Sequence, residues 1–167
     1  MRLFVAVELA PELRDALSAA IVSLKQQGAS ANFTRRENMH LTLAFIGETP
    51  RLAEAKAALE TVAALPFRIE LQGSGAFGDL VWAGVRRNPD LDMLASRVRD
   101  ALRGAGFRLD PKPFKPHITL ARRLVCAEKP TVELPLASAP VRDFVLMRSD
   151  RVDGRLVYTP VFRKTLG

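Results

Sequence analysis

Blocks of apolar and polar residues along this chain predict strands and helices in alternation. Leu3–Val7 is apolar throughout and predicts a buried strand, and Leu41–Ile46 predicts a second one. Between them, leucine and isoleucine recur at helical spacing after Pro11, and Gly28 ends the predicted helix. The first part of the chain is therefore predicted to be strand, helix, strand.

The remaining apolar blocks repeat these two kinds of element. One helix is predicted over Leu52–Leu65, and another runs from Pro89 to the glycines at Gly104 and Gly106. Further strands are predicted on either side of a Gly-rich turn over Gly73–Gly78 and later in the chain: Phe67–Leu71, Leu80–Val85, His117–Leu120, Val132–Leu136, Val141–Met147 and Leu156–Val161. Because no long linker interrupts them, residues 1–167 are expected to form one α+β domain.

The order of these elements indicates an internal duplication. The interval from Leu3 to His40 equals that from Leu80 to His117, and each holds a strand, a proline-initiated helix, a glycine stop and a loop. Two such strand–helix–strand units predict a bilobal, pseudo-symmetric fold made of two similar, intertwined lobes. Coincidence is the alternative, because strand–helix–strand units are common.

The two histidines of the chain occupy the same four-residue pattern. They lie in His40-Leu41-Thr42-Leu43 and in His117-Ile118-Thr119-Leu120. Random placement of the chain's threonines and leucines would give both matches with odds of roughly one in 20,000. One copy alone would suggest a histidine on a half-buried strand, whereas two copies that use every histidine favour a shared function.

Strand geometry places the polar residues of each pattern together. Side chains at positions i and i+2 share one face of a strand, so each imidazole lies beside a threonine hydroxyl. The intervening apolar residues point the other way, into a core. Two such strands facing each other across a central cleft would present two groups that titrate near neutral pH and two hydroxyl donors.

This set of groups suits hydrolysis of a phosphodiester without a metal. One imidazole would activate water, the other would protonate the leaving oxygen, and the hydroxyls would hold the phosphate oxygens. A zinc site is the rival hypothesis, but neither histidine has Asp, Glu or Cys two or four positions after it. A Ser-His-Asp triad would leave the paired threonines unexplained. We therefore expect no metal and no other cofactor.

Six basic residues lie close to the two patterns in the sequence: Arg35, Arg36, Lys112, Lys115, Arg122 and Arg123. Their charge favours a phosphate-bearing substrate, and we expect Lys115, Arg122 and Arg123 to contact it. Strict alternation would place Arg123 on the face of His117 and Arg122 on the opposite face, unless the strand twists or bulges at its end.

Two phenylalanines near the patterns are candidates to stack on a nucleobase. Phe45 follows the first pattern, and Phe114 precedes the second. Core packing is the alternative for each of them. Phe45 is included among the expected substrate-binding residues.

Composition narrows the class of protein. The 167 residues are 48% hydrophobic and carry a net charge of +7, which fits a globular domain and favours a phosphate or nucleic-acid partner; a codon bias toward arginine is the alternative. The single cysteine, Cys126, excludes an intramolecular disulfide. No apolar run reaches the roughly 18 residues of a membrane helix. We therefore expect a cytoplasmic protein that does not bind a membrane.

Three stretches of the chain resemble one known family. They are Met1-Arg-Leu-Phe-Val-Ala-Val-Glu-Leu9, Glu37-Asn-Met-His-Leu-Thr-Leu-Ala-Phe-Ile-Gly-Glu48 and Phe114-Lys-Pro-His-Ile-Thr-Leu-Ala-Arg122. They are similar to the bacterial and archaeal RNA 2',3'-cyclic phosphodiesterases, historically called 2'-5' RNA ligases, of the two-histidine phosphoesterase superfamily. The stretch Ser149–Tyr158 resembles the closing hairpin of that family less distinctly.

The resemblance implies two antiparallel sheets flanked by helices, with the active site in the cleft between them. It also implies hydrolysis of an RNA-terminal 2',3'-cyclic phosphate to a 2'-phosphate. The sequence leaves open whether the substrate is a tRNA fragment, another cleaved RNA or a small cyclic nucleotide. We expect a monomer, because one cleft between the two lobes already completes the site. By the same resemblance His40 is the general acid and His117 is the general base. Thr42 and Thr119 would bind the phosphate, and Arg122 would contact the base or a neighbouring phosphate.

Two other functions are compatible with these residues. An RNA ligase would join the cyclic-phosphate end to a 5'-hydroxyl through a 2'-5' bond, with the same residues and the hydroxyl in place of water. A non-catalytic RNA- or nucleotide-binding module is the second alternative. Both His/Thr pairs are intact, which argues against the second, because a binding module has no need of two titratable groups on either side of a phosphate.

Overall fold

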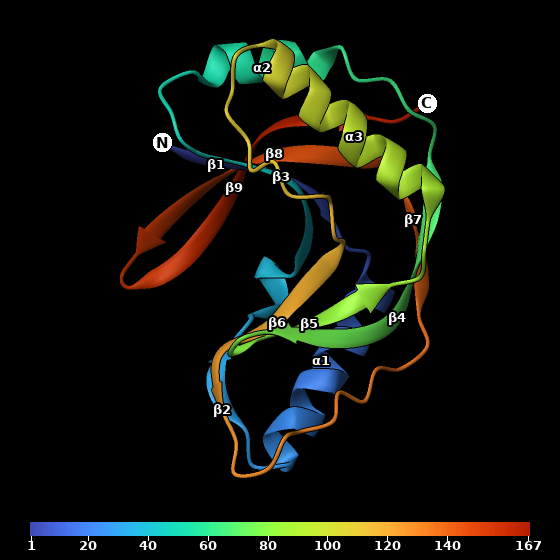
Figure 1. Ribbon diagram of the computed structural model, residues 1–167, viewed down its shortest axis with the longest axis vertical. Coiled ribbons are helices and arrows are strands. Elements are labelled where there is room, and N and C mark those ends of the chain that lie inside the picture. The colour runs from blue at the N-terminus through green and yellow to red at the C-terminus, as the bar shows by residue number, and fades with distance from the viewer.

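The computed structural model describes residues 1–167, and its strands form two separate antiparallel sheets (Figure 1). The first sheet has four strands in the order β3 (His40–Glu48), β1 (Arg2–Glu8), β8 (Asp143–Val152) and β9 (Arg155–Thr165). The second has five strands in the order β2 (Ser30–Phe33), β6 (His117–Val125), β5 (Leu80–Val85), β4 (Phe67–Phe77) and β7 (Ser138–Val141). The predicted α+β class with two antiparallel sheets is confirmed.

Three helices cover these sheets, and a short 3-10 helix, η1 (Arg36–Asn38), precedes β3. Helix α1 (Pro11–Gln26) follows β1 but packs on β6 and β7 of the other sheet. Helix α3 (Pro89–Gly104) follows β5 but packs on β3, with α2 (Leu52–Glu60) beside it (Figure 1). Each proline-initiated helix therefore covers the sheet to which the strand before it does not belong.

The predicted limits of the two proline-initiated helices are confirmed, and local chemistry explains them. Proline at the first helical position lacks the N–H that would be unpaired there. At the start of α3, the side chain of Asn88 accepts hydrogen bonds from the amides of Asp90 and Leu91, both at 3.1 Å. Past the end of α1, Gly28 has a φ of 89°, a left-handed conformation that suits glycine.

Two predicted elements are shorter than expected or absent. Helix α2 ends at Glu60 rather than Leu65, and the side chain of Thr61 caps it by donating to the carbonyl of Ala58 at 2.6 Å. Residues 132–136 form no strand, because they have no strand partner. The chain beside them is instead held by Gln27, whose side chain exchanges hydrogen bonds with the backbone of Thr131.

Three strands differ from prediction because pairing partners set their limits. Strand β4 continues through the predicted turn at Gly73–Gly78 as far as Phe77, which pairs with Leu80 of β5. The predicted strand Val141–Met147 is divided at Arg142, where the chain leaves the five-stranded sheet in β7 and enters the four-stranded sheet in β8. Strand β2 was not predicted, and it forms by pairing with the edge of β6.

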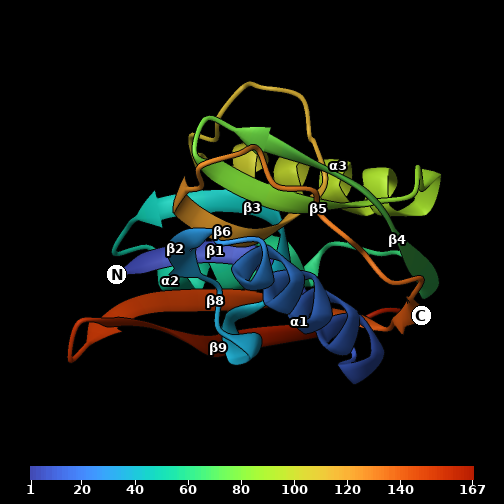
Figure 2. The ribbon, with the colours of Figure 1, turned by 90° about the horizontal axis from the view of Figure 1, so that it is seen from below.

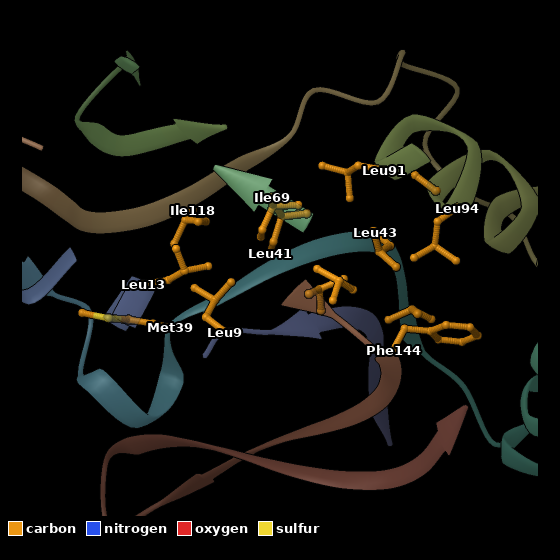
Figure 3. Packing of buried hydrophobic residues seen from close by; sticks show 14 of the residues in the cluster. Leu9, Leu13, Met39, Leu41, Leu43, Ile69, Leu91, Leu94, Ile118 and Phe144 are labelled. Carbon is orange, nitrogen blue, oxygen red and sulfur yellow. The ribbon is translucent and has the colours of Figure 1, made fainter. Parts of the chain in front are cut away.

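The main core forms where the helices pack on the two sheets, and it fixes the strands that carry the histidines. Leu41 and Leu43 of β3, and Ile118 and Leu120 of β6, are fully buried there, as the alternation predicts. Figure 3 shows Leu41 and Ile118 in the same packed region. Burying one such side chain contributes about 1.5–3 kcal/mol. The core thus fixes the opposite, polar face of each strand in place.

The polar face of the four-stranded sheet has a small apolar cluster of its own. It consists of Phe4, Ala6, Val145 and Met147, with Tyr158 packed against it. Tyr158 belongs to the β8–β9 hairpin, a long ribbon whose turn projects from the body of the protein (Figures 1 and 2). No helix is long and apolar enough to cross a membrane.

Candidate functional site

The first histidine pattern occupies the start of β3, with its polar residues on the face opposite the core. His40 and Thr42 are half-buried. Nδ1 of His40 lies 2.7 Å from the carbonyl oxygen of Asn38, and Nε2 lies 3.0 Å from Oγ1 of Thr42. A carbonyl oxygen only accepts, so Nδ1 carries a proton and Nε2 is the atom available for proton transfer.

The second pattern repeats the contact between Nδ1 and a backbone carbonyl at the start of β6. Nδ1 of His117 lies 2.7 Å from the carbonyl oxygen of Lys115, which again is two residues before the histidine. Thr119 is half-buried beside it, and its carbonyl accepts a hydrogen bond of 2.9 Å from the hydroxyl of Thr34. Both imidazoles are therefore held by a backbone carbonyl and leave Nε2 for chemistry, as in a pair of acid–base groups.

Aromatic rings pack against both imidazoles. The ring centroid of His40 lies 4.9 Å from that of Phe4 and 5.2 Å from that of Tyr158. The ring centroid of His117 lies 5.2 Å from that of Phe77 and 6.2 Å from that of Trp82. Tyr158 and Phe77 present their edges, at 88° and 85° to the imidazoles. These contacts restrict ring rotation and keep each imidazole in a defined orientation.

The environment of His40 disfavours its charged form. Burial lowers the pKa of His40 below 6.5, and the positive charges of Arg122, His117 and Arg14 lower it further, against the raising effect of the Asn38 carbonyl. Burial likewise raises the pKa of Tyr158, which the charge of Arg122 opposes. The site is thus positively charged around a half-buried imidazole, and an anion bound there would be stabilised.

A bulge in β6 decides which arginine shares the face of the second histidine. Trp82 of β5 lies opposite Thr119, but the preceding residue lies opposite Ala121, so Leu120 is an extra residue. Leu120 and Ala121 are both buried, and Arg122 returns to the face of His117. Strict alternation would place Arg123 rather than Arg122 on the face of His117, and this expectation is wrong because the strand bulges near its end.

Arg123, the next residue, has a different position from the one that alternation predicts. It is exposed and has a φ of 54°, in the left-handed region. A second irregularity in the pairing of β6 with β2 lies at this point. The strand therefore turns at Arg123, and only Arg122 continues the polar face that carries the histidine.

The same bulge occurs in β3 and places Phe45. Ala6 of β1 lies opposite Thr42, whereas the preceding residue lies opposite Ala44, and Leu43 is the extra residue. Phe45 is 48% exposed on the face of the first histidine, with the Arg2 guanidinium 4.7 Å from its ring centroid. Phe45 and Arg122 are both the fifth residue after their histidine, so the two bulges give the two halves matching positions.

The other basic and aromatic residues predicted near the site have varied surroundings. Lys115 is exposed, and its ammonium lies 5.2 Å from the ring centroid of Phe77. Phe114 packs on the main core, so the alternative of core packing holds for it. Arg35 and Arg36 form ion pairs with Glu37 and Asp15: the nitrogen–oxygen distances are 3.1 Å and 2.7 Å respectively.

Arg99 of α3 connects the two patterns, and sequence analysis gave no sign of it. Its Nε donates to the carbonyl of Leu43 at 2.9 Å, and its Nη1 donates to the carbonyl of Lys112 at 3.3 Å. Its guanidinium lies 5.1 Å from the ring centroid of Phe114. Arg99 thus ties the bulge of β3 to the loop that leads to His117.

The aromatic neighbours of the imidazoles were also missed. Phe4 and Trp82 lie on strands that the sequence predicts, whereas Phe77 lies in the stretch predicted as a turn. Nothing in a single strand tells which strand will pair with it. The only sequence signal is the alternation at the start of β5, which places Trp82 on the face away from the main core; β1 is apolar throughout and gives no such signal for Phe4.

The groups present at the site suit acid–base chemistry better than metal binding. The structure contains no cluster of three or more His, Cys, Asp or Glu side chains that could hold a metal ion. A surface cavity of about 340 Å³ lies between α3 and the loop over residues 111–114, and neither histidine lines it. Two oriented imidazoles, two hydroxyls and Arg122 are the groups that remain for chemistry on a phosphate.

Comparison with known proteins gives a consistent result. A chain from Archaeoglobus fulgidus named RNA 2',3'-cyclic phosphodiesterase is 38% identical over 130 residues, which cover 73% of this chain and 72% of that one. One of the same name from Escherichia coli is 33% identical, covering 99% of this chain and 96% of that one. A longer one from Geobacillus stearothermophilus is 36% identical, and this chain spans 41% of its length.

A solved structure and a family model agree with these relatives. The crystal structure of Escherichia coli LigT in its apo form superposes with a TM-score of 0.84 at 30% identity, covering 99% of this chain and 96% of that one. The family model of the 2'-5' RNA ligase superfamily matches residues 12–153. The histidine patterns lie inside that match, and the chain belongs to the 2'-5' RNA ligase superfamily.

Proposed function

We propose that this protein hydrolyses RNA-terminal 2',3'-cyclic phosphates to 2'-phosphates without a metal. The observation that carries the proposal is the matched pair of imidazoles, each bound through Nδ1 to a backbone carbonyl and each beside a threonine. Relatives named RNA 2',3'-cyclic phosphodiesterase support it. So do crystal structures of Escherichia coli LigT complexed with 3'-AMP and with phosphate.

The proposed reaction uses the Nε2 atoms of the two imidazoles, with the roles of acid and base that the resemblance to the family implies. His117 takes a proton from water, whose oxygen forms a bond to phosphorus. The bond from phosphorus to O3' breaks, and His40 gives its proton to O3', which leaves a 2'-phosphate and a 3'-hydroxyl. Thr42 and Thr119 donate hydrogen bonds to the non-bridging oxygens and hold the phosphate in line between the imidazoles.

The role of general acid requires that His40 be protonated when the substrate is bound. Burial and nearby positive charge lower its pKa in the free protein. A bound phosphodiester carries a negative charge that opposes the charge of Arg122 and favours the imidazolium. Substrate binding and protonation of His40 are therefore coupled, and His40 is charged in the complex that reacts.

The substrate-binding residues are assigned from their faces and charges. Phe45 and Arg122 share the faces of the histidines and are exposed, so they suit a base and a phosphate. Lys115 and Arg123 are exposed beside the second pattern and suit further phosphates of an RNA strand. We further propose that the substrates are RNA ends such as tRNA fragments and that the protein is cytoplasmic. We propose a monomer because both imidazoles come from one chain.

A pair of histidine variants tests the proposed function. His40→Ala and His117→Ala should each abolish hydrolysis of 2',3'-cyclic AMP, with the product of the parent protein identified as the 2'-phosphate. Circular dichroism and thermal unfolding check that both variants fold. Full activity in either variant would exclude the mechanism, and binding without turnover by the parent protein would favour a binding module.

Treatment with EDTA tests the absence of a metal in the reaction. Activity should survive exhaustive chelation, because the proposed acid, base and phosphate ligands are all side chains. A loss of activity that added metal restores would contradict the proposal. The matched control is the same chelation applied to the His40→Ala variant, which should stay inactive throughout.

A further inference from the structure

An exposed aromatic surface lies beside the second histidine, on the face of the five-stranded sheet that carries the site. Phe77 of β4 is 42% exposed, and its ring centroid lies 5.4 Å from that of Trp82 on β5. The ammonium of Lys115 lies 5.2 Å from the Phe77 ring and 5.8 Å from the Trp82 ring. We call these three residues the Phe77 platform. The platform borders His117, against which Phe77 and Trp82 pack, and of its three members only Lys115 belongs to the proposed substrate-binding residues.

The platform depends on a glycine beneath the indole. Gly75 of β4 pairs with Trp82, and a Cβ at position 75 would lie 2.7 Å from Cη2 of the indole. The indole ring therefore lies flat across the strand, where a larger residue would lift it. Nε1 of Trp82 is buried and has no hydrogen-bond partner, so packing alone holds the ring in this orientation.

The core does not explain why Phe77 is aromatic. Phe77 belongs to neither apolar cluster and lies at the end of β4, next to the turn at Gly78. One of its neighbours is the ammonium of Lys115, which an aromatic face attracts. A flat aromatic face with a mobile cation beside it is the combination that binds a nucleobase and an adjoining phosphate.

The position of the platform indicates which nucleoside it takes. In the proposed reaction, which this inference rests on, His117 activates the group that attacks phosphorus. When that group is water, there is no second nucleoside to lie on the platform. When it is the 5'-hydroxyl of a second RNA strand, the first nucleoside of that strand must lie beside His117, where the platform is.

We propose that the Phe77 platform binds the nucleoside on the attacking side of a 2'-5' phosphodiester. In joining, the 5'-oxygen forms a bond to phosphorus, the bond from phosphorus to O3' breaks, His117 takes the proton of the 5'-hydroxyl and His40 gives one to O3'. Cleavage of the 2'-5' bond is the reverse and restores the cyclic phosphate. The substrate class is thus an RNA junction with a nucleoside on each side of the phosphate.

Kinetics on two substrates test the platform. Phe77→Ala and Phe77→Leu should lower kcat/KM for cleavage of 2'-5'-linked adenylyl adenosine about tenfold more than for hydrolysis of 2',3'-cyclic AMP, the size expected of one stacked base. Phe77→Tyr keeps the ring and should restore the ratio of the parent protein. Leu136→Ala, a change at a 92% exposed residue in the loop before β7, is the control for loss of an exposed apolar side chain.

An equal loss on both substrates would overturn the proposal, because Phe77 would then only support His117 or hold the base of the cyclic nucleotide. Failure of the proposed function appears separately, as activity that persists in His40→Ala. The two failures therefore give different results. If Phe77→Ala lowers kcat/KM for neither substrate, the platform proposal is also overturned, while the proposed hydrolysis of cyclic phosphates is unaffected.

Intrinsic fluorescence provides a direct measure of binding, because Trp82 is the only tryptophan of the chain. In the His40→Ala variant, which blocks turnover, the 2'-5' dinucleotide should quench Trp82 emission, and 2',3'-cyclic AMP should quench it less at equal saturation. Adding Phe77→Ala should weaken binding of the dinucleotide about tenfold. Equal quenching by both ligands would contradict the assignment.

Discussion

Arg99 gives the most quantitative test of how the two histidine strands are held together. Arg99→Ala removes the 2.9 Å hydrogen bond to the Leu43 carbonyl, the 3.3 Å bond to the Lys112 carbonyl and the contact with the Phe114 ring at 5.1 Å. The shorter bond has a charged donor and contributes about 1.5–2 kcal/mol, and the longer bond and the ring contact add roughly 0.5–1 kcal/mol each. The expected loss of unfolding free energy is therefore about 2.5–4 kcal/mol.

Thermal and urea unfolding measure this loss. For a chain of this length, about 2.5–4 kcal/mol corresponds to a fall in Tm of roughly 5–16 °C. Arg99→Lys keeps the charge but cannot reach both carbonyls at once, and it should recover less than half of the loss. Arg97→Ala is the matched control on the same helix, because Arg97 is exposed and donates only to the carbonyl of Ala63, at 2.6 Å.

Activity separates positioning from plain stability. At a temperature where all variants are folded, Arg99→Ala should lower kcat for 2',3'-cyclic AMP more than it raises KM, because the spacing of the two imidazoles matters most in the transition state. The reasoning is refuted if Arg99→Ala is no less stable than Arg97→Ala, or if its kcat is unchanged while it is measurably destabilised.

Three further results are expected. The profile of kcat/KM against pH should be bell-shaped, and Arg122→Gln should move its alkaline limb to higher pH, because the charge of Arg122 lowers the pKa of His40. Arg123→Gln is the control for loss of a nearby positive charge. An alkaline limb that does not move in Arg122→Gln would contradict the assignment of His40 as the acid. The pKa of His40 is lower in the folded protein than the value of 6.5 in the unfolded chain, so between these two pKa values the unfolded chain binds more protons. The free energy of unfolding should therefore fall as the pH drops below about 6.5. Urea unfolding of His40→Gln should show a weaker fall. Gly75→Val should displace the indole, shift the emission of Trp82 to longer wavelength and lower stability by about 1–3 kcal/mol, and an unshifted spectrum would exclude the packing described.

The parts of the site that could be predicted are those that depend on local spacing. His40 and Thr42 share a strand face because alternate side chains do so in any strand, and the same holds for the second pattern. The leucines between them are buried as expected. The proline and glycine signals of α1 and α3 were reliable because they act on the backbone of their own helix.

The parts that could not be predicted depend on partners from elsewhere in the chain. The bulges at Leu43 and Leu120 exist only as a mismatch in count between two paired strands, so no single strand shows them. They decide that Phe45 and Arg122, rather than their neighbours, share the faces of the histidines. The limits of β4 and the division between β7 and β8 are likewise set by pairing.

The sequence by itself determined that two imidazole–hydroxyl pairs would lie on two buried strands of an α+β protein, because alternation and amphipathic spacing are local properties of the chain. Only the tertiary structure decided that α1 and α3 each cover the opposite sheet, and that Arg99 ties β3 to the loop before β6. It also decided that His40 is half-buried with a lowered pKa. Burial, electric field and bridging contacts are sums over neighbours distant in sequence, and those neighbours are set only when the chain has folded.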